Sequence, residues 1–293
     1  MNIVARLKDD NEVARLSALG VDVFLLDTDV LTTKAIFPLD KKMFVSMVNL
    51  IKNENKRVYV WLNKMIHESD LIDLRSWFNC FLTVEIDGIV INDFSVYVLA
   101  REFHLEDKII YQPGTMNTNS FDVVYLENRI KGMTLSKEIT LAEIEAIISQ
   151  KTNLEFSLVG HGYIDMFYSK RHLISLYLEH KKIKGYHVKN SPHYSIEEKT
   201  RPGIHFPIFE DEKGTHIFRD KKLESFKEVE CLKDFLSDFF IERLFLSDQE
   251  YYDAISSYVN HQGDAFLAKY GKEYHDGFYY LPTQKVKGEH YED

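Results

Sequence analysis

Residues 21–63 contain the stretch that decides the fold: VDVFLLD at 21–27, LDKKMFVSMVNLIKN at 39–53 and RVYVWLN at 57–63. The first and last segments are short apolar runs rich in β-branched and aromatic residues, which favour buried β-strands. The segment between them repeats apolar residues at helical spacing, which predicts an amphipathic helix near 40–54. A strand, a helix and a second strand in this order predict two parallel strands joined by a right-handed crossover.

The same alternation continues along the rest of the chain. Eight strand–helix units in about 260 residues favour a closed (β/α)8 TIM-like barrel. An open doubly wound sheet is the alternative, and the seventh and eighth units argue against it. No GxGxxG or GxxxxGK pattern follows an expected strand, so dinucleotide-binding and P-loop sites have no support. The remaining strands are expected at 2–6, 87–93, 108–114, 130–138, 153–160 and 241–248.

One long segment interrupts this alternation. Residues 170–225 separate the seventh expected strand from a helix expected near 226–238. Within the segment, RPGIHFPIFEDEKGTHIF (201–218) alternates around a DEKG turn, which predicts a β-hairpin. An excursion of this length from a barrel is usually functional. We therefore expect a barrel over 1–262 that includes the insert 170–225, followed by a C-terminal extension over 263–293 that packs on the barrel and frays at its end.

The composition excludes several classes of protein. The chain has 293 residues and a net charge of −10, so it is not coated with the positive charge of a nonspecific nucleic-acid-binding protein. It has no apolar run of the roughly 18 residues that a membrane helix needs, and residues 1–16 lack the apolar core of a signal peptide. We expect a cytoplasmic protein without a membrane partner. Two cysteines, Cys80 and Cys231, are too few for a disulfide scaffold, a four-cysteine zinc site or a self-contained iron–sulfur cluster.

Polar side chains follow several of the expected strands. In a barrel, the carboxyl ends of the strands form the face that carries the active site, where side chains could bind a base, a sugar or an organic acid. Alternatively, such residues cap the next helix or satisfy loop backbone, which explains Asp93 and Asn119 equally well. The candidates for substrate binding are Asn63, Asp93, Asn119, Lys137, Glu138 and His161.

The insert also concentrates positive charge. Residues 170–201 hold eight lysines and arginines against three glutamates, with three tyrosines interleaved. Basic side chains neutralise phosphates and aromatic rings stack on unpaired bases, so the segment could contact single-stranded RNA or a partner protein. A solvated insert with ordinary salt bridges is the alternative. The candidate contacts are Lys181, Lys182, Lys184, Tyr186 and Lys189.

Residues 157–175, SLVGHGYIDMFYSKRHLIS, resemble the signature of the collagenase-like peptidases, peptidase family U-32. That signature reads E-x-F-x-x-G-[SA]-[LIVM]-C-x-x-x-x-G-x-C-x-[LIVM]-S, and its spacing is kept without a gap. Asp165 and His172 occupy the two cysteine positions, with Arg171 beside the second. RVYVWLN, DGIVIND and the predicted hairpin also resemble family elements, so the likeness covers nearly the whole chain. The matching positions are Gly162, Ile164, Ile174 and Ser175.

The resemblance implies a barrel and one of two activities. The family name implies proteolysis, whereas other members hydroxylate RNA bases or quinone precursors with an iron–sulfur cluster held by four cysteines, two of them in the signature. The transfer-RNA branch makes 5-hydroxyuridine at the wobble position. This chain resembles a shorter, cluster-less branch. That likeness implies a non-catalytic auxiliary subunit with no cofactor of its own, which works on transfer RNA with a cysteine-bearing homologous partner that holds the iron–sulfur cluster.

Two interpretations of the replaced cysteines stay open. Asp165 and His172 could bind one zinc or iron ion with a third group such as a nearby histidine, which would make the chain an independent enzyme. Alternatively, polar residues filled the space when the cluster was lost, and we therefore expect no metal. An independent enzyme could also use the barrel face on a small molecule.

A collagenase-like peptidase is a further alternative. Such an enzyme needs an activated nucleophile. Ser175 has no G-x-S-x-G elbow around it and is expected in the first turns of a helix, while Cys80 and Cys231 are expected in the core. Whether the chain catalyses any reaction by itself stays open.

Overall fold

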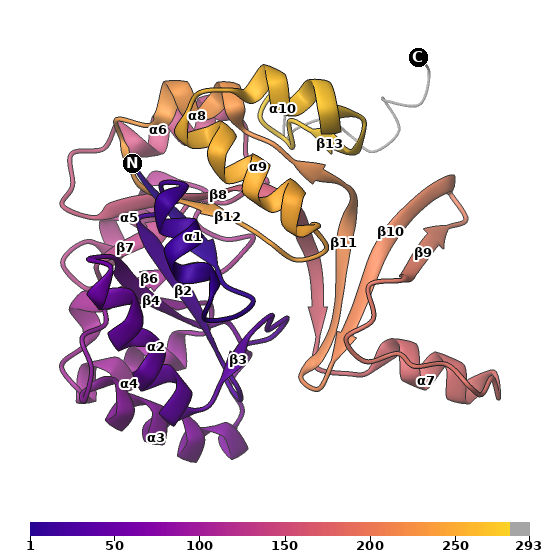
Figure 1. The fold of residues 1–293 in the computed structure, drawn as a ribbon, viewed down its shortest axis with the longest axis horizontal. Helices are drawn as coiled ribbons and strands as arrows, with labels where there is room; N and C mark the ends of the chain where they lie inside the picture. The colour runs from indigo at the N-terminus through magenta and orange to yellow at the C-terminus, as the bar shows by residue number, and fades with distance from the viewer. Residues whose placement is uncertain (282–293) are drawn as a thin grey trace.

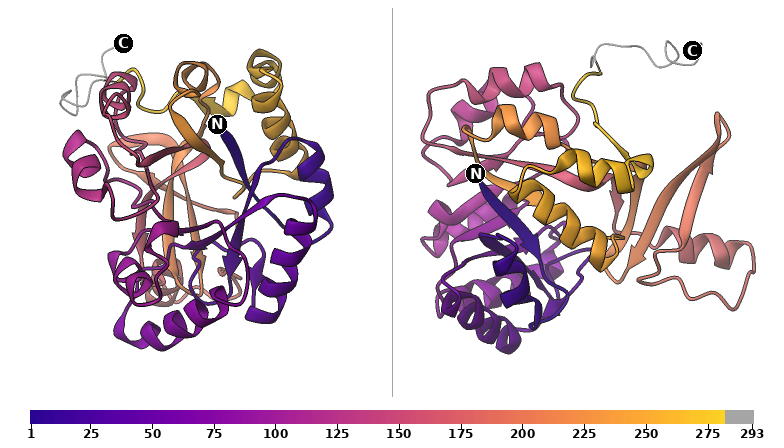
Figure 2. Two further views of the ribbon diagram at one scale, coloured as in Figure 1. Left: turned by 90° about the vertical axis from the view of Figure 1, so that its left-hand side faces the viewer. Right: turned by 45° about the horizontal axis from the view of Figure 1, so that its top comes forward.

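The computed structural model describes residues 1–281, and within them eight parallel strands close into a barrel. The strands follow the order β12-β1-β2-β4-β5-β6-β7-β8, and β12 pairs back to β8. Helices surround the strands (Figures 1 and 2). The predicted (β/α)8 barrel is confirmed. The barrel strands are β1 (Asn2–Arg6), β2 (Val23–Thr28), β4 (Arg57–Leu62), β5 (Gly88–Ile91), β6 (Ile109–Tyr111), β7 (Gly132–Thr134), β8 (Glu155–Ser169) and β12 (Leu236–Ile241).

The apolar runs form strands because both of their faces are buried. All six residues of β2 are buried, as are the last five of β4. One face fills the barrel interior with side chains such as Leu25, Trp61 and Phe240, and the other packs beneath the helices. The covering helices are α1 (Glu12–Ala18), α2 (Lys41–Asn53), α3 (Leu71–Phe81), α4 (Phe94–Glu102), α5 (Ser120–Leu126), α6 (Leu141–Ile148), α8 (Phe226–Leu232) and α9 (Asp248–Val259).

The eighth strand lies earlier in the chain than the sequence predicts. A helix was expected near 226–238 and a strand at 241–248, but α8 ends at Leu232 and β12 ends at Ile241. The strand takes LSDFFI because its aromatic and aliphatic side chains are buried in the barrel. After Ile241 the chain leaves the barrel: Arg243 pairs with Glu12 on α1 at 2.6 Å. This ion pair accounts for polar residues that the prediction had placed within a strand.

The seventh barrel strand is much longer than the predicted 153–160. β8 pairs with β7 and β12 in the barrel, then continues to Ser169 and pairs antiparallel with β11 (Gly214–Leu223). β11 pairs with β10 (Arg201–Asp211), which confirms the predicted hairpin, and β10 pairs with β9 (Tyr194–Glu198). We call β8 beyond the barrel, α7 (Leu173–His180) and β9–β11 the flap. Figure 1 shows β9, β10 and α7 projecting away from the barrel.

The segment after the barrel packs against α9 and the flap. The short helix α10 (Gly263–Tyr270) places Phe266 in the main hydrophobic core, and β13 (Tyr274–His275) pairs with β11. β3 (Pro38–Leu39) adds a short pairing to β2. Residues 282–293, where fraying was expected, lie outside the described residues.

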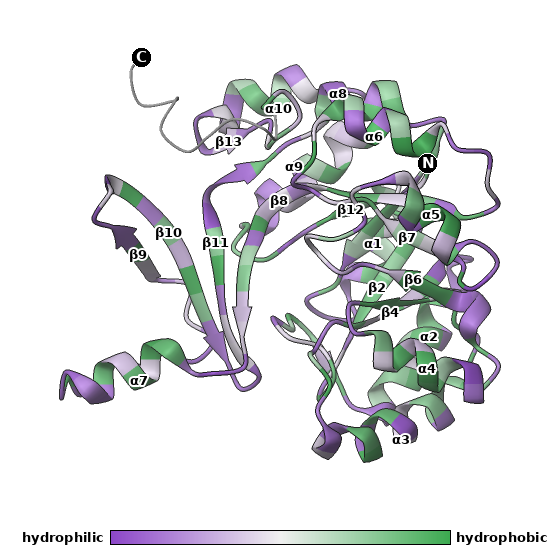
Figure 3. Cartoon of the chain, turned by 180° about the vertical axis from the view of Figure 1, so that it is seen from behind, coloured by the Kyte–Doolittle hydropathy of each residue, from purple (hydrophilic) through white to green (hydrophobic). Residues whose placement is uncertain are grey.

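Hydrophobic residues are concentrated in the barrel strands and in the helices around them, as the ribbon coloured by hydropathy shows (Figure 3). Among the described helices, none has both the length and the apolar character that crossing a membrane requires.

Gly162 marks the point where β8 leaves the barrel, and its substitution should be costly. Its φ is +103°, and an added Cβ would lie 2.7 Å from the backbone oxygen of Glu242. A left-handed conformation alone costs an L-residue about 1–2 kcal/mol. Because the Glu242 backbone cannot move aside easily, Gly162→Ala should cost at least roughly 2 kcal/mol more than that. Urea denaturation measures the difference.

Gly203→Ala is the matched control for this substitution. Gly203 also has a positive φ, of +82°, but an added Cβ would meet nothing within 4 Å. The Gly203→Ala variant therefore measures the stability lost to the left-handed backbone conformation alone, without a steric clash of the added Cβ. Equal losses of stability in the two variants would contradict the packing assigned to Gly162.

Candidate functional site

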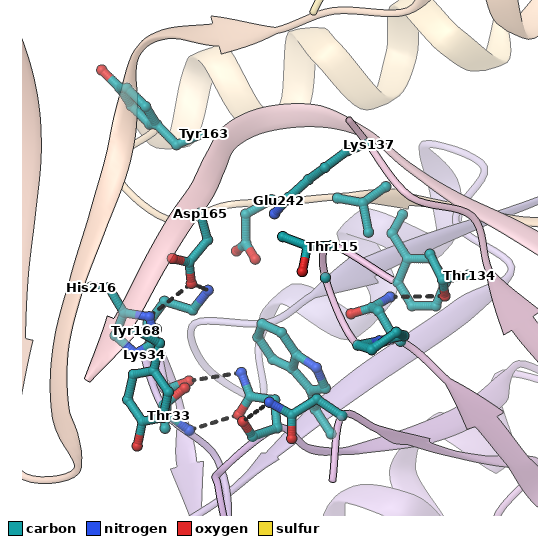
Figure 4. A pocket seen from close by; sticks show the side chains of 18 of the residues that line it. Thr33, Lys34, Thr115, Thr134, Lys137, Tyr163, Asp165, Tyr168, His216 and Glu242 are labelled. Carbon is teal, nitrogen blue, oxygen red and sulfur yellow. Dashed lines mark hydrogen bonds and ion pairs between the residues drawn. The ribbon is translucent and has the colours of Figure 1, made fainter. Parts of the chain in front are cut away.

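The carboxyl ends of the barrel strands surround a cavity of about 480 Å³. Its floor is apolar and includes Leu25, Trp61, Val159 and Phe240 from the barrel interior. Charged and polar side chains line its walls, and β8 and β11 of the flap form one side (Figure 4). An apolar floor with a few convergent polar groups is typical of a small-molecule or nucleotide site.

Arg6, at the end of β1, organises one wall of the cavity. Its guanidinium donates to Asp27 at 2.8 Å, to Glu242 at 2.7 Å and to the backbone oxygen of Lys34 at 2.7 Å. It also lies over the Trp61 ring, 4.6 Å from the ring centroid. Burial alone would lower the pKa of Arg6, but Asp27 and Glu242 raise it above its ordinary value. This wall is therefore a fixed ion cluster.

A loop over residues 29–37 brings Lys34 to the cavity. The backbone N–H of Thr33 donates to Oδ1 of Asn63 at 2.7 Å, and the backbone N–H of Lys34 donates to Asp211 at 2.7 Å. These two bonds anchor the loop to β4 and to the flap. The Lys34 ammonium is thereby placed 2.7 Å from Oδ2 of Asp165.

Asp165, which is partly buried, and His216, which is buried, form a pair across β8 and β11. Nδ1 of His216 lies 2.7 Å from Oδ2 of Asp165, the same oxygen that accepts from Lys34. The His216 ring stacks on Tyr168 at 4.5 Å. Oδ1 of Asp165 and Nε2 of His216 are buried and have no hydrogen-bond partner among residues 1–281. Both free atoms are therefore available to a ligand.

The protonation states of this pair follow from its surroundings. Burial would raise the pKa of Asp165, but the charge of Lys34 and the hydrogen bond from His216 hold it below its ordinary value. Burial lowers the pKa of His216, which its bond to Asp165 only partly offsets. At neutral pH the site thus holds an ionised carboxylate and a neutral imidazole with one free nitrogen.

Lys137 enters the cavity from the loop after β7. It is half-buried, and its ammonium makes no hydrogen bond or ion pair with any described residue. Burial lowers the pKa of Lys137, with a partial offset from the charge of Asp165. In Figure 4 the amine is directed toward Glu242.

The structure brings two of the six strand-end candidates to the cavity. Asn63 and Lys137 line it, whereas the neighbouring Glu138 does not. Asp93 caps α4 by accepting from Ser95 at 2.9 Å, and Asn119 caps α5 by accepting from Phe121 at 3.0 Å. Asp93 and Asn119 are therefore helix caps, as the alternative interpretation expected. Neither of them lines the cavity, so their predicted place in the pocket is wrong.

His161 is a core histidine, which corrects the expectation that it faces a pocket. Its ring nitrogens lie 3.2 Å from the hydroxyls of Tyr258 and Tyr274, and Phe226 and Phe266 pack around it. The pairing of β8 with β12 shifts between Val159 and His161, and this irregularity turns the His161 side chain outward beneath the helices. Burial lowers its pKa to about 3, so it is neutral.

The signature positions diverge in space. Asp165 faces the cavity, whereas His172 lies at the start of α7 on the flap, beyond the end of β8. Arg171 is exposed beside it. Among residues 1–281, no group of three or more His, Cys, Asp or Glu side chains is arranged to hold a metal ion. The metal interpretation therefore lacks a ligand set.

Ser175 has a structural partner. Its hydroxyl donates to the fully buried carboxylate of Glu210, which also accepts the backbone N–H of Ile174 at 2.8 Å. Glu210 thus satisfies the first turn of α7, where unpaired N–H groups are left by helix geometry. Ser175 lies in the predicted helix turn, and within residues 1–281 its hydroxyl makes its hydrogen bond to Glu210 and not to a histidine.

The residues present do not fit an iron–sulfur cluster. Neither cysteine lines the cavity: Cys80 lies on α3 against the core, and Cys231 is exposed on α8. Asp165, at the first signature position, is held by Lys34 and His216, and His172 at the second lies apart from it. Cluster ligation requires thiolates, which this site does not supply.

The basic candidates lie in the connection between α7 and β9. Lys181, Lys182, Lys184 and Tyr186 are exposed. Lys189 differs, because its ammonium pairs with Glu212 at 2.5 Å. Most of the predicted contact set is therefore free to meet an external partner.

Sequence analysis missed four side chains of the site: Arg6, Lys34, His216 and Glu242. Two of them left a signal, since Arg6 and Glu242 are charged residues at the ends of apolar runs that form adjacent barrel strands. Lys34 and His216 lie in a loop and a hairpin, and no local pattern indicates that they reach Asp165.

Comparisons with known proteins show which proteins this chain is similar to. The sequence profile of Peptidase family U32 matches residues 19–287. tRNA hydroxylation protein P2 of Bacillus subtilis (strain 168) is 26% identical over 226 residues, covering 76% of this chain and 72% of that protein. tRNA hydroxylation protein P of Escherichia coli (strain K12) is 26% identical over 221 residues, covering 60% of this chain but only 48% of the relative. A solved structure, the U32 peptidase Mk0906, has a TM-score of 0.49 at 14% identity, covering 82% of this chain and 92% of that one.

The assignment of His161 to the core predicts a pH dependence. The unfolded chain binds a proton at this histidine below pH 6.5, while the folded chain does so only near pH 3. Stability is therefore lost as the pH falls from 6.5, by roughly 1.4 kcal/mol per pH unit. Between pH 7 and 4.5, urea unfolding should show that the wild type loses about 2–3 kcal/mol more than His161→Asn.

His193→Asn controls for the loss of a histidine as such. His193 is exposed on the flap, so this variant should follow the wild-type pH profile. If His161→Asn follows it as well, the buried neutral histidine is not the cause of the acid sensitivity.

Proposed function

The chain belongs to peptidase family U32, and from this premise we propose that it is an auxiliary subunit of transfer-RNA hydroxylation. It binds transfer RNA and pairs with a cysteine-bearing homologous subunit, which holds the iron–sulfur cluster. Together the two subunits form 5-hydroxyuridine at the wobble position. The chain itself carries no redox cofactor and acts in the cytoplasm, where transfer RNA is modified.

The observation that carries this proposal is the state of Asp165. It stands at a cysteine position of the family signature, yet its carboxylate is shared by Lys34 and His216. A carboxylate committed to two charged or polar partners is not available to iron, and it is a poor substitute for a thiolate. The cavity is nevertheless retained at about 480 Å³. A cavity that lacks cluster ligands can bind part of a substrate, but it cannot transfer electrons through an iron–sulfur cluster.

The flap supports a role in RNA binding. Residues 170–201 carry five net positive charges within a chain of net charge −10. The exposed lysines of the α7–β9 connection lie beside the exposed rings of Tyr177 and Tyr186, a combination that suits phosphates and unpaired bases. The same strands, β8 and β11, supply Asp165 and His216 to the cavity. The flap that carries these lysines therefore shares two strands with the wall of the cavity.

The relatives support the RNA class of substrate. The Bacillus subtilis and Escherichia coli proteins are both named for tRNA hydroxylation. The match spans about half the length of the Escherichia coli protein.

The peptidase alternative has less support. The hydroxyl of Ser175 donates to the buried carboxylate of Glu210, and among residues 1–281 it makes no hydrogen bond to a histidine. Cys231 is exposed on an outer helix and Cys80 packs under one. Neither arrangement supplies an activated nucleophile next to the cavity.

Neutralising the flap should weaken binding to transfer RNA. In the triple variant Lys181→Gln, Lys182→Gln and Lys184→Gln, three exposed charges are lost, and affinity at low salt should fall at least about tenfold. The slope of log affinity against log salt should decrease by about 2–3, because each lost phosphate contact removes roughly 0.7–0.9 of slope. Filter binding with unmodified transfer RNA over a salt series measures both quantities.

A matched triple variant tests whether the effect is local. Lys42→Gln, Lys151→Gln and Lys227→Gln remove the same charge from exposed positions on the barrel side. This variant should bind transfer RNA nearly as well as the wild type. Equal weakening by both triples would show that net charge, not the flap, determines binding.

Reconstitution tests whether RNA binding and redox chemistry reside on different subunits. The purified chain and its cysteine-bearing homologue are added, separately and together, to a hydroxylation-deficient extract, and 5-hydroxyuridine in transfer RNA is measured by mass spectrometry. Product should require both chains, because RNA holding and redox chemistry reside on different subunits. Equal product from the homologue alone would end the proposal.

A further inference from the structure

The side chain that the proposed function leaves unused is Lys137. It stands in the cavity wall after β7, and its amine makes no hydrogen bond or ion pair with any described residue. The other cavity cations are committed: Arg6 to Asp27 and Glu242, and Lys34 to Asp165. An amine that faces a cavity without a partner is available to a ligand.

The carboxylates around this amine indicate which ligand it takes. Oδ2 of Asp165 carries both of that residue's hydrogen bonds, and Oδ1 is buried and unpartnered. Glu242 uses Oε1 for Arg6, and Figure 4 shows the Lys137 amine directed toward Glu242, with Asp165 beyond it. An anion brought to this amine would meet two ionised carboxylates at close range, which is unfavourable in a buried site. A neutral ligand meets no such repulsion.

The amine is also suited to act as a nucleophile. Burial favours the neutral form of Lys137, which is the form with a free electron pair. The imidazole of His216 lines the same cavity with an unpartnered Nε2, which can accept the proton that the ammonium loses. The apolar floor of Leu25, Trp61 and Val159 excludes water from one side of the site.

We propose that Lys137 forms an imine with a small neutral carbonyl compound bound in the cavity. The amine nitrogen adds to the carbonyl carbon, and the oxygen takes up a proton. Loss of the second proton from nitrogen and departure of the oxygen as water leave a C=N bond. One amine and one carbonyl thus become one imine and one water, with no oxidant or reductant. The inference does not rest on the proposed role in RNA hydroxylation.

The cavity limits the carbonyl compound by size and polarity. A volume of about 480 Å³ admits an aldehyde or ketone of a few carbons with room to spare. Hydroxyl groups on it could form hydrogen bonds with Thr134 and Gln112, which also line the cavity. A short hydroxy-aldehyde or hydroxy-ketone fits this set of groups best.

Reductive trapping tests the inference on the full chain. Glycolaldehyde and cyanoborohydride are added at neutral pH, and modified lysines are located by peptide mass spectrometry. Lys137 should be labelled at least about tenfold faster than the exposed Lys151, because a bound carbonyl is held beside the amine. Its labelling rate should saturate with glycolaldehyde concentration, whereas that of Lys151 should rise linearly. Labelling of Lys137 at the rate of Lys151, without saturation, overturns the proposal.

Variants and an anionic probe complete the test. Lys137→Arg should abolish the saturable label, and Lys151→Arg should leave it unchanged. Both variants should melt like the wild type, because neither side chain has a partner to lose. Glyoxylate, which carries a carboxylate, should label Lys137 more slowly than glycolaldehyde after normalisation to Lys151. Faster labelling by glyoxylate would overturn the assignment to neutral carbonyl compounds.

Discussion

The carboxylate of Asp165 is the group on which the mouth of the barrel depends. One oxygen accepts from Lys34 and from His216, each at 2.7 Å, and so ties the loop over 29–37 to β8 and β11. Lys34 in turn connects to Arg6 through its backbone oxygen. Because these groups are buried, removing one partner would leave an uncompensated charge, which is far more costly than the net value of the pair. The wall of the cavity is held in place because each of these charged groups has its partner.

The same interaction is the reason why we propose that this chain holds no iron–sulfur cluster. A cysteine at position 165 could offer a thiolate to iron, whereas the aspartate present is committed to two neighbouring side chains. The second signature position, His172, lies on the flap at the start of α7. What remains is a polar cavity beside a basic flap, which suits binding. Within that cavity Lys137 is the one amine without a described partner, and it provides chemistry that needs no metal.

The fold could be predicted from the sequence because each unit is local. An apolar run buried on both faces and an amphipathic helix leave patterns within about 20 residues of each other. The predictions failed where a long-range contact decides the outcome. β8 extends past residue 160 because β11 pairs with it. The eighth strand ends at Ile241 because Arg243, two residues later, forms an ion pair with Glu12. The same limit applies to the site. Asn63 and Lys137 directly follow strands, so the sequence predicted their place at the cavity. The contact between Lys34 and Asp165 joins residues 131 positions apart, and no local pattern indicates it.

Anaerobic reconstitution of the purified chain with iron and sulfide tests the central claim most directly. The account predicts no iron–sulfide absorption near roughly 400 nm above that of a protein blank, because the two signature positions offer a committed carboxylate and a distant imidazole in place of thiolates. A stable centre at about one per chain, lost on Asp165→Asn, would contradict it.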